Sequence, residues 1–175
     1  MTRVHKPLPT AELFSEGAIT TESFVLDKGF GEKTKQGIWL FPEEALYLAE
    51  KGKLALVKKR GLTLKGIRRH FSKSVSNFLT RYFAYRDLRE KGFVVKAGSK
   101  YGADFRLYEK GVKPTNDERE HSKYLIWVLG EDDFLEMKNL IGINRVSHSV
   151  KKRLILAVID KENDVTYLQL ARTLL

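Results

Sequence analysis

The sequence predicts an α+β N-terminal domain over residues 1–78, followed by an α/β C-terminal domain over residues 79–175 with a central mixed sheet flanked by helices. Three observations lead to this prediction. Short β-like segments separated by Gly-rich turns fill the first 40 residues, a helical aromatic stretch comes later, and apolar strand-like runs dominate after Gly92. A chain of 175 residues with 42% hydrophobic content is long enough to bury a core in one domain or two small ones.

In the N-terminal part, Pro42 stands where the first residue of a helix is expected, with two glutamates in the first turn. Gly52 is expected to follow the end of this helix. Thr63 is expected to cap a second, basic helix that runs to Lys73. The strands predicted around these helices are Ser23–Leu26, Gly37–Phe41 and Leu54–Val57.

In the C-terminal part, a long helix is predicted from about Ser76 to Lys91, and Gly92 is expected to end it. The helical spacing of its aromatic residues is typical of core packing. The predicted strands are Phe93–Ala97, Asp104–Tyr108, Lys123–Leu129, Leu154–Asp160 and Asp164–Leu170. The predicted helices between these strands are Phe134–Ile141 and Asn144–Lys152.

The net charge of the chain is strongly positive, at +10, with a pI of about 9.7. Residues 51–86 contain eleven Lys or Arg and no Asp or Glu. Such a basic surface suggests a polyanionic partner, with nucleic acid first and an anionic membrane second, although a simply solvated surface explains it too.

Cysteine is missing from the sequence, which excludes disulfides and thiolate metal sites. The first ten residues are polar and contain Pro7 and Pro9, so we do not expect them to form a signal peptide. Since no apolar run approaches the roughly 20 residues of a membrane span, we expect a soluble, cytoplasmic protein.

Tyr108 is the first candidate for chemistry. Strand alternation places Asp104, Arg106 and Tyr108 on one face, with Phe105 and Leu107 toward the core. Tyr108 ends its strand beside a long loop, a common position for a site residue, although an ordinary sheet tyrosine fits the same pattern.

His121 closes that loop just before the next apolar strand. Histidine donates and accepts protons near neutral pH, which makes it a candidate acid or base.

If the segment after Asn144 is helical, with Asn144 as its cap, Arg145, His148 and Lys152 share one face. A positive stripe near a helix start favours phosphate, although a solvated basic face is an equally good reading.

Three sequence blocks, in this order, resemble the archaeal tRNA-splicing endonucleases of the short, single-repeat type. They are Lys100–Tyr108 (KYGADFRLY), Glu120–Ser122 (EHS) and Arg145–Lys152 (RVSHSVKK), supported by Tyr85–Arg89 with Gly92. The resemblance covers about residues 75–172 well and implies that residues 79–175 form a catalytic nuclease domain.

The resemblance implies a role for each residue of a triad. Tyr108, rather than Tyr101, matches the catalytic tyrosine and would act as general base. His121 matches the general acid, and Lys152, rather than Lys151, matches the lysine that stabilises charge in the transition state. The implied reaction is attack by the 2′-hydroxyl of the RNA on the adjacent phosphorus, which leaves a 2′,3′-cyclic phosphate and a 5′-hydroxyl without a metal or other cofactor.

The family also implies how RNA is recognised and how subunits assemble. Its substrate is the bulge–helix–bulge of precursor tRNA, where two arginines clamp a bulged base, and Arg145 and Arg172 are the matching candidates. Relatives of this length form homotetramers, or tetramers with a separate structural subunit, through an acidic loop. Glu131, Asp132 and Asp133 fit that loop, although acids at a helix start explain the same residues.

Two other functions compete with this one. Asp104 with Glu136 and Lys138 can be fitted to the pattern of a metal-dependent nuclease, although Glu136 falls on a predicted helix. A non-catalytic RNA-binding or structural subunit is also possible, but such a subunit is expected to lack the triad.

Overall fold

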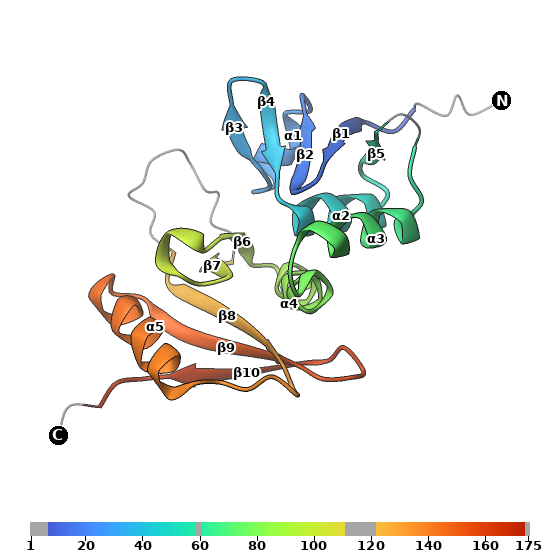
Figure 1. Cartoon of the computed structure of the whole chain (residues 1–175). Helices are drawn as coiled ribbons and strands as arrows, with labels where there is room; N and C mark the ends of the chain where they lie inside the picture. The colour runs from blue at the N-terminus through green and yellow to red at the C-terminus, as the bar shows by residue number, and fades with distance from the viewer. Residues whose placement is uncertain (1–6, 59–60, 111–121, 174–175) are drawn as a thin grey trace. The chain divides into compact units, whose positions relative to one another are not determined.

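The computed structural model describes residues 7–58, 61–110 and 122–173. The chain divides into two units, Met1–Phe78 and Leu79–Leu175, and each has its own five-stranded sheet (Figure 1). Within the described residues, no helix has the length and apolar character needed to cross a membrane.

The first unit is a mixed five-stranded sheet with helices in its connections. The strand order is β3-β4-β2-β1-β5, in which only β1 and β5 are parallel. The elements in chain order are β1 (Thr10–Phe14), β2 (Gly17–Thr20), α1 (Phe24–Asp27), β3 (Glu32–Thr34), β4 (Gly37–Leu40), α2 (Pro42–Glu50), β5 (Ala55–Val57) and α3 (Leu64–Ser74).

Local sequence signals account for most of these elements. Thr63 caps α3, because its hydroxyl accepts a hydrogen bond from the Gly66 N–H at 3.2 Å. Gly52, directly after the C-cap of α2, has a φ of 61°, which suits glycine. The strand predicted at Ser23–Leu26 is wrong, because Ser23 is the N-cap of the short helix α1 and residues 24–26 lie within it. A short apolar run does not distinguish a strand from a helical turn.

Glu44 is a buried carboxylate that joins three segments of the first unit. Its side chain is only 2% exposed, and its two oxygens accept hydrogen bonds from the N–H groups of Phe41 and Gly31, both at 3.0 Å. The bond to Phe41 satisfies a free donor at the start of α2. The bond to Gly31 fixes the loop before β3 to the same helix.

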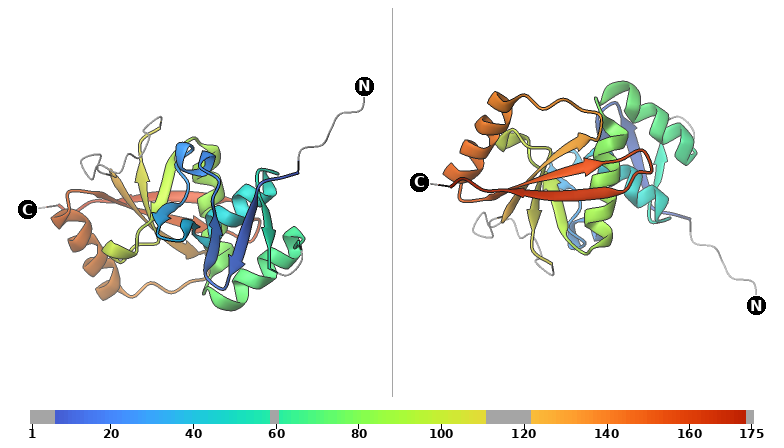
Figure 2. Two further views of the ribbon diagram at one scale, coloured as in Figure 1. Left: turned by 90° about the horizontal axis from the view of Figure 1, so that it is seen from above. Right: turned by 90° about the horizontal axis from the view of Figure 1, so that it is seen from below.

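The second unit is a mixed sheet with the strand order β10-β9-β8-β7-β6, in which only β8 and β9 are parallel. Figure 2 shows β9 and β10 as a long hairpin. The elements are α4 (Phe78–Glu90), β6 (Val94–Ala97), the 3₁₀ turn η1 (Ser99–Tyr101), β7 (Phe105–Tyr108), β8 (Tyr124–Gly130), α5 (Met137–Ser149), β9 (Arg153–Ile159) and β10 (Val165–Leu170). The predicted fold class, with its mixed sheet and helices, is confirmed.

Helices α4 and α5 pack against opposite faces of this sheet. Tyr85 of α4 is 1% exposed and lies with its ring centroid 5.8 Å from that of Phe105. Ile143 of α5 instead forms a cluster with Leu125 and Leu154. Since Phe105 pairs with Ile126, it lies on the sheet face opposite to Leu125. The prediction that the aromatic residues of α4 form core is therefore confirmed.

The prediction of two helices, Phe134–Ile141 and Asn144–Lys152, is wrong, because α5 is one continuous helix. Asn144 lies inside it, and Glu136 is the N-cap. Gly142 costs a helix about 1 kcal/mol relative to alanine, but packing of one face outweighs such a local penalty. Ile143 and Ser147, 8% and 2% exposed, form that buried face.

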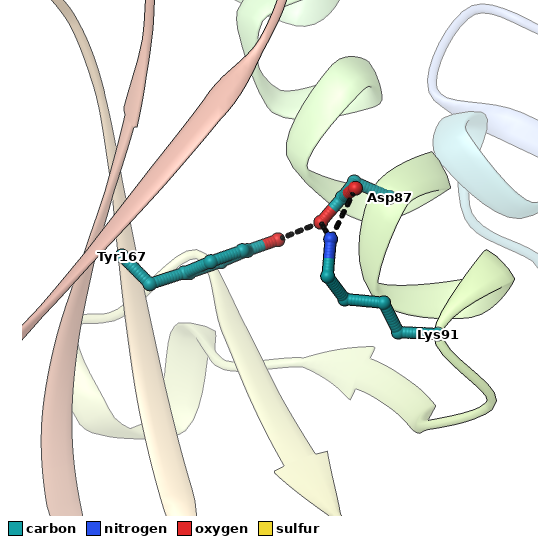
Figure 3. Close-up of polar contacts among 3 residues, drawn as sticks. All are labelled: Asp87, Lys91 and Tyr167. Atoms are coloured by element: carbon teal, nitrogen blue, oxygen red, sulfur yellow. Dashed lines mark hydrogen bonds and ion pairs between the residues drawn. The ribbon is translucent and has the colours of Figure 1, made fainter.

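A polar contact ties α4 to the edge strand β10 (Figure 3). The Tyr167 hydroxyl donates to an Asp87 oxygen at 2.6 Å, and Lys91 Nζ lies 2.5 Å from both oxygens of the same carboxylate. Burial, followed by the hydrogen bond and charge of Asp87, raises the pKa of Tyr167. The phenol therefore remains a donor at neutral pH.

Tyr167→Phe is expected to lower the free energy of unfolding by about 1.5–3 kcal/mol, the usual size for a hydrogen bond to a charged group. Thermal and urea denaturation measure this loss. Tyr124→Phe is the matched control, because Tyr124 makes no side-chain hydrogen bond within the described residues and should change stability little. Equal effects of the two variants would show that the contact with Asp87 contributes nothing.

Candidate active site

Three strand ends meet at one end of the second sheet. β7 runs antiparallel to β8, so Leu107, near its end, pairs with Tyr124 at the start of β8. β8 runs parallel to β9, so Tyr124 also pairs with Arg153 at the start of β9. The end of β7 and the starts of β8 and β9 therefore lie side by side, although they are far apart in sequence.

Tyr108 is the last residue of β7 and is only 8% exposed. Arg106 is two residues earlier and therefore lies on the same face of the strand. The Arg106 guanidinium carbon lies 5.9 Å from the centroid of the Tyr108 ring. The phenol is thus a largely buried group beside a cation.

Lys152 lies just before β9 and is 9% exposed, whereas the neighbouring Lys151 is exposed. Its Nζ donates a hydrogen bond to the carbonyl oxygen of Ser122 at 2.6 Å and lies 5.5 Å from the centroid of the Tyr101 ring. Burial, and then the positive charge of Arg106, lower the pKa of Lys152. The side chain is held in one place by partners on both sides.

Register places the groups of this site on the same face of the sheet. Arg106 pairs with Leu125, which pairs with Leu154, so all three lie on the face that α5 covers. Tyr108 is two residues after Arg106, and Lys152 is two residues before Leu154. The period of two in a strand therefore puts Tyr108 on that same face. Lys152 precedes β9, and its Nζ lies over the ring of Tyr101, which packs against the same cluster.

His121 lies outside the described residues. Ser122, the residue that follows it in the chain, is described and is 4% exposed. The Ser122 carbonyl is the acceptor for Lys152, and the next residue, Lys123, donates its N–H to the Leu107 carbonyl at 3.0 Å. The segment directly after His121 is thus bonded to both β7 and Lys152.

The predicted helical stripe of Arg145, His148 and Lys152 is wrong. α5 ends at Ser149, Lys151 has a φ of 54°, and Lys152 lies beyond the turn with its side chain buried. Arg145 and His148 are exposed in the C-terminal half of α5 rather than near its start. The helix dipole therefore does not add to an anion site there, as the stripe had suggested.

Arg172 is exposed and follows β10 by two residues. Since Leu170 pairs with Leu154, the end of β10 lies at the same end of the sheet as Lys152. Arg145 is two residues after Ile143, which packs on Leu154 in the core cluster. Both candidate arginines are thus on elements that reach this end of the sheet.

Glu131, Asp132 and Asp133 follow β8 directly. Lys161 Nζ lies 3.5 Å from Glu131 and 3.3 Å from Asp132, while Asp133 accepts a hydrogen bond from the Gly130 N–H at 2.7 Å. Phe134, next in the chain, is fully exposed. The loop thus contacts the turn between β9 and β10, and the Phe134 ring beside it is exposed.

Asp104 and Glu136, the carboxylates of the metal-dependent alternative, have separate partners. Asp104 accepts a hydrogen bond from the Val128 N–H at 2.8 Å and lies 3.5 Å from Arg81 Nε, and burial raises its pKa. Glu136 pairs with Lys138 at 2.9 Å. Within the described residues, no three His, Asp or Glu side chains gather as a metal site requires.

Two family models match the chain. Residues 78–167 match the model described as tRNA intron endonuclease, catalytic C-terminal domain, and residues 20–58 match the model described as tRNA-splicing endonuclease subunit sen54 N-term. The chain belongs to the tRNA intron endonuclease family. The first match contains the described parts of the strand-end site, with Tyr108, Ser122 and Lys152.

Several archaeal proteins named tRNA-splicing endonuclease are similar over most of the chain. The protein of Methanothermobacter thermautotrophicus is 40% identical over 145 aligned positions, and the match covers 79% of each chain. That of Thermococcus gammatolerans is 37% identical over 79% of each chain, and that of Methanopyrus kandleri is 34% identical over 89% of this chain and 86% of the relative. The predicted family and enzyme class are confirmed by these matches.

Two side chains contact the candidate residues of this endonuclease family member, and sequence reasoning assigned neither of them a role. For Arg106, the alternation of side chains along the strand predicted that it lies on the same face as Tyr108. Tyr101 approaches Lys152 only through the 3₁₀ turn η1 and the αL conformation of Gly102, at φ 69°. No periodicity in the sequence predicts that approach.

Proposed function

We propose that this chain cuts precursor tRNA at the two intron junctions of a bulge–helix–bulge. The observation that carries the proposal is the meeting of Tyr108 and Lys152 at one end of the sheet, where Lys152 is bonded to the Ser122 carbonyl, in a member of the tRNA intron endonuclease family. His121, peptide-bonded to Ser122, supplies the third group in this proposal. The +10 net charge accounts for the attraction of RNA.

In the proposed reaction, Tyr108 acts in its phenolate form, which the nearby positive charge of Lys152 favours, and accepts the proton of the 2′-hydroxyl, whose oxygen attacks the adjacent phosphorus. His121 gives a proton to the departing 5′-oxygen. Lys152 stabilises the negative charge on the non-bridging oxygens of the phosphorane. The products are a 2′,3′-cyclic phosphate and a 5′-hydroxyl, and no metal takes part.

Recognition in this proposal depends on shape, since unpaired RNA bases can be stacked on arginine planes. Arg145 and Arg172 clamp a bulged base, and their exposure on elements that reach the same sheet end supports this assignment.

Two symmetric cuts require two sites, so we further propose a homotetramer in which Glu131, Asp132 and Asp133 contact a basic surface of another subunit.

The reaction is tested with a bulge–helix–bulge RNA that has a single 2′-deoxy sugar at one junction. We expect wild-type protein in excess chelator to cut the ribose junction at its normal rate and to leave the deoxy junction uncut, because the nucleophile is missing there. Cutting at the deoxy junction would rule out attack by the 2′-hydroxyl. Loss of all cutting in chelator would favour the metal-dependent alternative, and RNA binding with no cutting in either condition would favour a structural subunit.

A further inference from the structure

Helix α3 of the N-terminal unit has a buried apolar face and, opposite to it, a basic face. Ile67 and Phe71 are 1% and 0% exposed, whereas Lys65, Arg69 and Lys73 are exposed. A spacing of four residues keeps these three cations in one row, and each step rises about 6 Å along the helix. Lys65 and Ile67 are two residues apart, which places the row of cations on the face opposite to the core.

The three cations of this row, called here the α3 stripe, form no ion pair within the described residues. Arg68 on the same helix behaves differently, because it pairs with Glu50 of α2. No acidic residue occurs anywhere between positions 51 and 86, so the helix itself offers no neutralising partner. An external polyanion would relieve the repulsion of three like charges on one exposed face.

We infer that the α3 stripe is a second RNA-binding surface, which contacts phosphates of the precursor RNA. This inference rests on the proposed function, since that function supplies RNA as the polyanion. A row of cations about 12 Å long suits an extended phosphate backbone. The acidic loop of a second copy suits it less, because Glu131 and Asp132 already lie within 3.5 Å of Lys161.

The test measures how the affinity for an uncut precursor tRNA, with 2′-deoxy sugars at both junctions, depends on KCl. Each phosphate contact adds about 0.7–0.9 to the slope of log Kd against log salt. The triple variant Lys65→Gln, Arg69→Gln and Lys73→Gln should therefore have a slope shallower by about 2–3, and Arg69→Gln alone by about 0.7–0.9. With cleavable RNA, KM should rise while kcat stays unchanged.

The matched control is the triple variant Lys33→Gln, Lys35→Gln and Lys53→Gln, which removes three exposed charges from the same unit. It should keep the wild-type slope to within about 0.5, less than one phosphate contact. The inference is overturned if the α3 variants keep the wild-type slope, or if their main effect is a smaller mass in solution, which would assign the stripe to a second copy. Failure of wild-type protein to cut ribose RNA would instead overturn the proposed function. Cutting is a separate measurement from the salt dependence of binding, so the two outcomes can be distinguished.

Discussion

Tyr108→Phe is expected to lower kcat for cleavage of a bulge–helix–bulge RNA by about 10²–10⁴-fold, the usual contribution of a positioned general base. The substitution removes one hydroxyl and keeps the ring, so the contact of the ring with Arg106 and the packing at the end of β7 remain. RNA affinity should therefore change little. Single-turnover cleavage measures the rate, and filter binding with a 2′-deoxy substrate measures the affinity.

Tyr124→Phe is the matched control for this experiment. Tyr124 lies beside Leu107 at the same end of the sheet, but on the face opposite to Tyr108. Its variant should cut RNA at the wild-type rate. Wild-type kcat in Tyr108→Phe would rule out Tyr108 as the base, and equal losses in the two variants would indicate a general disturbance of this sheet end.

Lys152→Met is expected to lower kcat by about 10²–10³-fold, since one preorganised partner of the developing charge is lost. Methionine retains much of the apolar stem that packs beside Tyr101 but cannot donate to the Ser122 carbonyl. Lys151→Met is the control, because Lys151 is exposed and adjacent. Normal cleavage by Lys152→Met, or an equal loss in Lys151→Met, would contradict the assignment.

The pH dependence of Lys152 offers a separate measurement. Burial and the charge of Arg106 lower its pKa in the folded protein, so the charged form is lost at a lower pH than the value of about 10.4 for an ordinary lysine. Cleavage should fall as the pH rises through this lowered pKa. Lys152→Arg, whose guanidinium stays charged, should lack that fall even where its rate at neutral pH is reduced.

The same shift predicts a change of stability with pH. Between the lowered pKa of the folded protein and the ordinary pKa of the unfolded chain, the unfolded chain binds more protons. The free energy of unfolding therefore rises with pH in this window. Urea denaturation across the alkaline range should show the rise in wild type, and Lys152→Met should remove it.

Elements with strong local signals were predictable from the sequence. Thr63 caps α3, Gly52 and Gly92 adopt positive φ just after their helices, and the strand-like runs after Gly92 form the second sheet. Each of these features depends on residues within one turn or one strand, so a local pattern contains the information. The family blocks are local in the same sense, because each is a short run around Tyr108, His121 or Lys152.

Two local patterns were misleading because distant contacts override them. Asn144 has the chemistry of an N-cap, yet burial of Ile143 and Ser147 keeps α5 continuous through Gly142. The apolar run from Ser23 fits a strand, but Val25 is fully buried in the short helix α1. Tertiary packing decides such cases, since propensity differences of less than about 1 kcal/mol per residue are small beside the burial of one side chain.

By itself the sequence determined the family, and it predicted Tyr108, His121 and Lys152 as the catalytic residues, because each of these inferences depends on a short run of residues. Only the tertiary structure decided that the ends of β7, β8 and β9 meet, and that Tyr108 and Lys152 lie at that one end of the sheet. It also decided that Lys152 leaves α5 and turns into the site, held between Ser122 and Tyr101. The pairs that set this register, Leu107 with Tyr124 and Tyr124 with Arg153, are 17 and 29 positions apart, so no local pattern contains them.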